Sequence, residues 1–110
     1  MINIEKLAGQ LEFDIEDVEE LLNMFIDGAI KSLEDIKQSF SNQDIKGIRD
    51  GAHAIKGSAG NLLLNEVYII AQRLEKSATE GRTMNLLGEY RELAQIIQQI
   101  EMEIKENVYA

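Results

Sequence analysis

The sequence contains no cysteine, no proline and no tryptophan, and it has a single histidine. Without cysteine the chain cannot build a disulfide framework, a thiolate nucleophile or a cysteine-based zinc site. Basic residues are also scarce: 11 Lys and Arg stand against 20 Asp and Glu, and the net charge is −9. Because binding to a phosphate backbone requires a basic face, we expect no nucleic-acid partner.

Long apolar runs are missing as well. None approaches the ~20 residues that cross a bilayer, and the N-terminal MINIEKLAGQ lacks the layout of a signal peptide. We therefore expect a cytoplasmic protein with no membrane insertion. Its 110 residues are typical of one domain, so we predict a single helical domain over 1–110 that exists as a monomer.

Helix-forming residues dominate what is present, chiefly Leu, Ile, Ala, Glu, Lys and Gln. Apolar residues recur at helical spacing, with Asp14 and Asp44 as candidate N-caps. The predicted helices cover 3–12, 15–40, 45–62, 66–79 and 85–108. Short connections favour antiparallel neighbours, so the predicted fold is all-α, an antiparallel four-helix bundle with a short additional N-terminal helix.

Each predicted helix has an apolar stripe for the core. The stripe of the second helix runs from Ile15 to Phe40, and that of the last runs from Leu86 to Val108. Met24 falls opposite the stripe of its helix, so we expect it to be exposed, and exposed Met is common at adaptable binding surfaces. The carboxylates at 14–20 spread around their helix and fit dipole capping, so we predict no metal site there.

The segment 45–62 departs from the pattern of an ordinary bundle helix because it contains four glycines. Each glycine costs roughly 1 kcal/mol relative to alanine inside a helix. The glycines are Gly47, Gly51, Gly57 and Gly60. Such a series of penalties indicates that something approaches this helix closely.

The segment also holds His53, the only histidine. At about 100° per residue, His53 lies roughly 130° from the centre of the apolar stripe, on the solvent side. Arg49 lies one turn before it, Lys56 and Gly57 lie one turn after it, and Gly60 lies beyond. The bare positions beside the imidazole predict a surface that docks another protein.

The chemistry open to this site is narrow. A lone imidazole without a triad cannot form a hydrolase. A neutral imidazole is nevertheless a good nucleophile near neutral pH, and phosphoryl transfer depends mainly on positioning and charge stabilisation. His53 can therefore carry a phosphoryl group on nitrogen, with Lys56 attracting its oxygens, while a partner supplies the metal and the acceptor carboxylate.

The residues His-Ala-Ile-Lys-Gly-Ser-Ala at 53–59, followed by Asn61 and Leu62, resemble the signature of histidine-containing phosphotransfer (HPt) domains of bacterial phosphorelays. The resemblance extends to Arg-Leu-Glu at 73–75, which is similar to the family's usual Leu-Glu, and to the long apolar helix from Ile15 to Phe40. It implies a helical bundle with an exposed histidine that is phosphorylated on Nε2.

By this resemblance His53 is the phosphoacceptor, Lys56 is the nearby cation and Gly57 is the gap that lets a receiver domain approach. Arg49, Gly60 and Met24 are further candidate contacts with the partner. The implied partners are a response-regulator receiver domain, a sensor histidine kinase or both, with no cofactor. One departure is Leu63, where the family commonly has glycine; we expect it to alter helix termination or packing.

Two other interpretations remain open. The chain can be the histidine-bearing domain of a chemotaxis-type kinase, phosphorylated directly by a kinase domain, or a helical adaptor that does not use His53. In none of the three is the chain itself a kinase, because the sequence has no Gly-rich phosphate loop following a strand.

Overall fold

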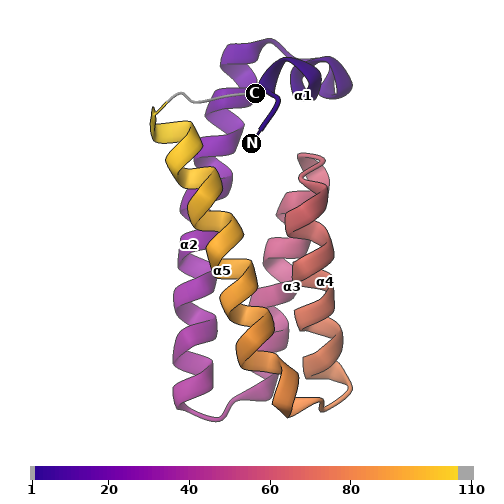
Figure 1. The fold of residues 1–110 in the computed structure, drawn as a ribbon, viewed down its shortest axis with the longest axis vertical. Coiled ribbons are helices and arrows are strands. Elements are labelled where there is room, and N and C mark those ends of the chain that lie inside the picture. Colours follow the sequence, from indigo (N-terminus) through magenta and orange to yellow (C-terminus); the bar gives the residue numbers. More distant parts are fainter. Residues whose placement is uncertain (1, 107–110) are drawn as a thin grey trace.

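Five α-helices make up the computed structural model, which describes residues 2–106 (Figure 1). They are α1 (Ile4–Leu11), α2 (Ile15–Ser41), α3 (Ile45–Asn61), α4 (Asn65–Thr79) and α5 (Thr83–Glu106). The predicted all-α fold is confirmed, and within the described residues the predicted boundaries lie at most two residues from these. Val108, predicted at the end of the last apolar stripe, lies outside the described residues.

Helices α2 to α5 run alternately up and down and form the bundle (Figure 1). Helix α3 packs between α2 and α4, and α5 packs on α4 and α2, which closes the ring. Helix α1 packs on α2 at one end of the bundle. This is the predicted antiparallel bundle with an additional N-terminal helix. Over residues 2–106, the structure contains no helix that is both long enough and apolar enough to span a bilayer.

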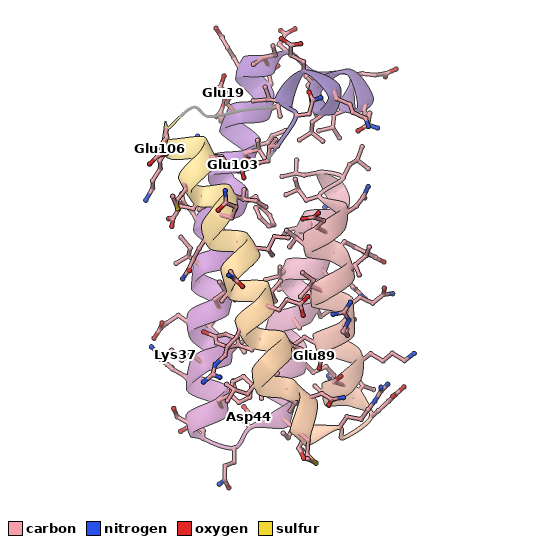
Figure 2. All side chains as sticks on the ribbon, in the orientation of Figure 1. Glu19, Lys37, Asp44, Glu89, Glu103 and Glu106 are labelled. Carbon is pink, nitrogen blue, oxygen red and sulfur yellow. The ribbon has the colours of Figure 1, made fainter. Side chains whose placement is uncertain are left out.

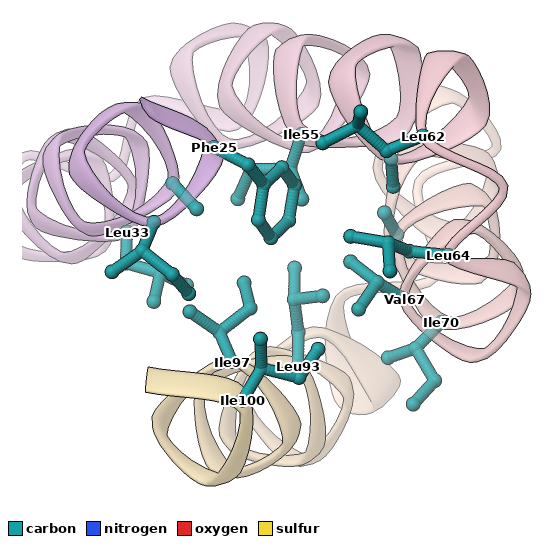
Figure 3. Close-up of a cluster of buried hydrophobic side chains, with 14 of the residues drawn as sticks. Phe25, Leu33, Ile55, Leu62, Leu64, Val67, Ile70, Leu93, Ile97 and Ile100 are labelled. Atoms are coloured by element: carbon teal, nitrogen blue, oxygen red, sulfur yellow. The ribbon is translucent and has the colours of Figure 1, made fainter. Parts of the chain in front are cut away.

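The core is almost entirely aliphatic and receives side chains from every helix. Figure 3 shows the part of it that lies between α2, α3, α4 and α5. Phe25 of α2 projects into its centre, between Ile55 of α3 and Leu93 and Ile97 of α5. The apolar stripe predicted for α2 is buried along most of its length. The prediction is wrong for Ile15, whose side chain is exposed at the first turn of the helix.

A side-chain cap forms at the start of α3 but not at the start of α2. The Asp44 carboxylate accepts a hydrogen bond from the Gly47 amide (3.0 Å) and caps α3 as predicted. Asp14 occupies the N-cap position of α2, but in this structure its side chain makes no capping hydrogen bond. Its contribution is therefore limited to placing negative charge at the helix N-terminus.

The first four helices end in the same way, with a residue in the left-handed conformation just beyond the helix. These residues are Glu12 (φ 59°), Gln43 (φ 55°), Leu63 (φ 57°) and Gly81 (φ 70°). At the end of α3, the Leu64 amide donates to the Ala59 carbonyl (2.9 Å) and the Leu63 amide donates to the Gly60 carbonyl (3.2 Å), which is the Schellman pattern. Leu63 was expected to alter helix termination or packing, and the part of this expectation that concerns helix termination is wrong. The turn keeps the form suited to glycine, and leucine adopts it with backbone strain.

Two of the four glycines in α3 permit close packing within the bundle. A Cβ on Gly51 would overlap Cγ1 of Ile36, and a Cβ on Gly47 would overlap Oγ of Ser39. Both neighbours belong to α2 and are buried. The close approach predicted from these glycines is therefore made by α2 of the same chain.

The N-terminal residues are fastened to the end of α5. The Ile2 amide donates to Oε1 of Glu103 (2.7 Å), whose side chain is nearly fully buried and is labelled in Figure 2. Helix α1 adds Ile4, Leu7 and Ala8 to the core.

Candidate functional site

His53 lies in the middle of α3, and 68% of its side chain is exposed. The buried residues of the helix, Ala52, Ile55 and Ala59, occupy the opposite side. The helical spacing predicted this orientation, and the structure has it. The imidazole is thus accessible to a macromolecular partner.

Glu75 of α4 reaches the histidine from the neighbouring helix. Its Oε2 lies 2.5 Å from Nδ1 of His53, and its Oε1 accepts a hydrogen bond from Nζ of Lys56 (2.6 Å). One carboxylate therefore joins His53 and Lys56. The sequence analysis did not predict this contact, although Glu75 is part of the Leu-Glu pair in the resemblance and could have been singled out there.

Lys56 is largely covered. Only 21% of the Lys56 side chain and 19% of the Glu75 side chain are accessible to solvent, because the two side chains cover each other between α3 and α4. The Glu75 hydrogen bond raises the pKa of Lys56, against the opposing effect of burial. Burial acts to raise the pKa of Glu75, but the hydrogen bonds from Lys56 and His53 outweigh it and lower that pKa. Both groups are therefore charged at neutral pH.

An ionised Glu75 fixes the tautomer of His53. A carboxylate can only accept hydrogen bonds, so Nδ1 of the imidazole must carry the proton in this contact. In the neutral ring the lone pair then resides on Nε2. This nitrogen is on the other side of the imidazole and is the nucleophilic atom of the site.

The two remaining glycines of α3 have different surroundings. Apart from its chain neighbours and the nearby backbone of α3, no atom of the described residues would lie within 4 Å of a Cβ on Gly57, whereas a Cβ on Gly60 would touch the ring of Tyr68 at 3.4 Å. Gly57 is therefore the open position beside His53, and Gly60 faces α4. Ser58, next to Gly57, is exposed as well.

The other two candidate residues lie outside the His53–Lys56–Glu75 group. Arg49 forms an ion pair with the adjacent Asp50 (3.4 Å), and both are exposed. Met24 is exposed on α2 and lines a surface depression with four residues near the start of that helix. Those residues are Phe13, Asp17, Glu20 and Leu21. Neither Arg49 nor Met24 contributes to the contacts that hold the imidazole.

The described residues form no cluster of three or more His, Asp or Glu side chains that could hold a metal ion. The carboxylates at 14–20, which the sequence suggested as capping groups, lie at the N-cap and in the first turns of α2. The group at His53 therefore consists of an exposed imidazole, a cation and one carboxylate that joins them.

Comparison with known proteins gives one match. The model of the family described as Hpt domain matches residues 20–106, which include α3, α4, α5 and most of α2 but not α1. No curated protein and no solved structure matches the chain significantly.

Proposed function

The chain belongs to the Hpt domain family, whose members are histidine phosphotransfer carriers of phosphorelays, and we propose that His53 is the residue that carries the phosphoryl group. The observation that supports this most is the contact between Nδ1 of His53 and Glu75 (2.5 Å). It leaves Nε2 as the nucleophile on a side chain that is 68% exposed. His53 is also the only histidine of the chain.

The proposed donor and acceptor is the aspartate of a receiver domain. The Nε2 lone pair attacks the phosphorus of the aspartyl phosphate, the N–P bond forms, and the P–O bond to the aspartate breaks. The bonding electrons leave with the aspartate as a carboxylate. The proton on Nδ1 stays in place, so the phosphorylated ring is positively charged, and the adjacent Glu75 carboxylate stabilises that charge. The reverse transfer uses the same groups.

Lys56 and Gly57 have supporting roles in this proposal. Lys56 is one turn from His53 on the same helix, within reach of the phosphoryl oxygens. Gly57 keeps the surface beside the imidazole free of a side chain, so that the loops around the receiver's aspartate can approach. The receiver supplies the metal ion and the carboxylate that in-line transfer requires.

Hpt domains are phosphocarriers and not kinases. We propose that this chain accordingly takes no phosphoryl group from ATP by itself. Its own contribution to the reaction is the oriented imidazole, the bridging carboxylate and one lysine.

A labelling experiment tests the proposal. The chain is incubated with a radiolabelled phospho-receiver, with a kinase domain and ATP, or with ATP and Mg²⁺ alone. We expect acid-labile label on the wild-type chain in the presence of a phospho-receiver, and no label on His53→Gln. Label obtained only from a kinase domain would favour the chemotaxis-type alternative. Undiminished labelling of His53→Gln, or labelling from ATP alone, would show that the proposal is wrong.

A further inference from the structure

Lys56 is already engaged before any phosphoryl group arrives. Its ammonium lies 2.6 Å from Oε1 of Glu75, on the carboxylate that also holds Nδ1 of His53. The pair is largely covered, with about a fifth of each side chain exposed. The cation next to the histidine is therefore bound to the α4 carboxylate that contacts the Nδ1 side of the ring.

We propose that, when His53 is phosphorylated, the Lys56 ammonium leaves the Glu75 carboxylate and binds the phosphoryl oxygens instead. The strength of the Lys56–Glu75 ion pair thereby limits how tightly Lys56 holds the phosphoryl group. This inference rests on the proposed function, because it requires phosphorylation of His53. It assigns Glu75 a second role, as a positioning residue that acts through Lys56.

The charges favour the exchange. A phosphoryl group carries about −1.5 to −2 at neutral pH and has three acceptor oxygens, while Glu75 carries −1. The lysine side chain is a flexible stem that ends in three donors, so its ammonium can move between neighbouring acceptors. His53 and Lys56 are three residues apart, and side chains at this spacing are neighbours on a helix.

Glu75 is not left without a partner by the exchange. It retains the Nδ1 proton of His53, and it faces a ring that has become positive because Nε2 is bonded to phosphorus. Loss of the lysine is thus offset by a stronger interaction with the imidazolium. The phosphoryl group, in turn, gains Lys56 only at the cost of breaking a short ion pair, which keeps it transferable to the next partner.

Other charged or titratable groups lie on the same two helices. Tyr68 of α4 is close enough to contribute to the raised pKa of Lys56. On α3, Arg49 is paired with Asp50 (3.4 Å), and Arg73 of α4 is paired with Glu92 of α5 (3.2 Å). The Arg73–Glu92 pair lies between α4 and α5, so it provides a control that weakens an α4 ion pair without touching His53.

The test compares the phosphoryl group in four versions of the full chain: wild type, Glu75→Gln, Lys56→Met and the double variant. Each is phosphorylated with phosphoramidate, whose P–N bond breaks with release of ammonia as the bond to Nε2 forms. The ionisation of the phosphoryl group is then followed by ³¹P NMR as a function of pH. A nearby ammonium lowers the phosphoryl pKa, so this pKa reports how closely Lys56 approaches.

We expect Glu75→Gln to lower the phosphoryl pKa by about half a unit, a roughly threefold change in the ionisation constant, because Lys56 no longer has a competing carboxylate. In the Lys56→Met background, Glu75→Gln should change the phosphoryl pKa by a clearly smaller amount. Arg73→Met should leave the phosphoryl pKa at the wild-type value.

Equal effects of Glu75→Gln in the two backgrounds would overturn the exchange, since Glu75 would then act on the phosphoryl group without Lys56. No change in the phosphoryl pKa on Lys56→Met would overturn it as well. Failure of the folded wild-type chain to take the group on His53 would instead count against the proposed function.

Discussion

Nδ1 of His53 lies 2.5 Å from Oε2 of Glu75, a residue 22 positions further along the chain and on the next helix. The orientation of the proposed nucleophile is therefore set by the packing of α3 on α4. Any change that shifts these two helices relative to each other should alter the reactivity of His53, even when the histidine itself remains exposed.

Glu75 should make stability depend on pH. Its pKa in the folded chain is below the ordinary value of 4.5, so its stabilising effect is complete above about pH 4.5 and is lost as the pH falls through the lowered value. We expect the free energy of unfolding of Glu75→Gln to lie below that of wild type near neutral pH, and the difference to narrow in acid. Urea unfolding at a series of pH values measures it. The control is Glu92→Gln, which removes an exposed ion pair and should have little effect on the free energy of unfolding at neutral pH. A difference in unfolding free energy between wild type and Glu75→Gln that stays constant down to strong acid would contradict the prediction.

Gly57→Ala should separate folding from function. Alanine is favoured over glycine by roughly 1 kcal/mol in a helix interior, and beyond its chain neighbours and the nearby backbone of α3 the added methyl group meets no atom of the described residues. We expect thermal unfolding to show unchanged or higher stability, and phosphotransfer from a receiver to become slower because the methyl group intrudes between the partners. Gly88→Ala on α5, which is also open around its Cβ, is the matched control and should leave transfer at the wild-type rate. Equal transfer rates for Gly57→Ala and wild type would argue against a docking role for this position.

Gly51→Ala should have the opposite effect on stability. The new Cβ would overlap the side chain of Ile36, which is fully buried, so α2 and α3 would have to move apart. Overpacking of this kind costs about 1–3 kcal/mol, to be measured as a loss of unfolding free energy in urea. A stability equal to or above that of wild type would mean that the two helices are not packed as closely as described.

Leu63→Gly should stabilise the chain. Leu63 has φ 57° at the end of α3, a conformation that costs a residue with a side chain about 1–2 kcal/mol but is open to glycine. Because some of this gain is offset by lost contacts of a half-covered leucine and by the freedom of glycine in the unfolded chain, we expect a net gain of about 1 kcal/mol or less.

The reciprocal change provides the control for the prediction at Leu63. Gly81 has the same left-handed conformation after α4 (φ 70°), so Gly81→Ala should destabilise the chain by about 1 kcal/mol. Differential scanning calorimetry of the two variants compares these effects directly. A lower unfolding temperature for Leu63→Gly would show that the contacts of the leucine outweigh its backbone strain.

The sequence by itself determined the helices and which way His53 points. Both depend on local regularities: apolar residues at a spacing of three and four define one face of a helix, and a residue on the opposite face is exposed whatever lies beyond the core. The same regularity identified Met24 as exposed. It failed at Ile15, because a residue in the first turn of a helix can extend past the neighbouring helices and find nothing to pack against.

Only the tertiary structure decided what surrounds the histidine. The contact of Glu75 with His53 and Lys56 depends on the register between α3 and α4, which is fixed by how their buried side chains interlock and not by the spacing within either helix. The roles of the glycines were decided in the same way. Gly51 is needed for close packing on α2 and Gly57 is open, although both occur in the same short segment, because only the position of the neighbouring helix distinguishes them.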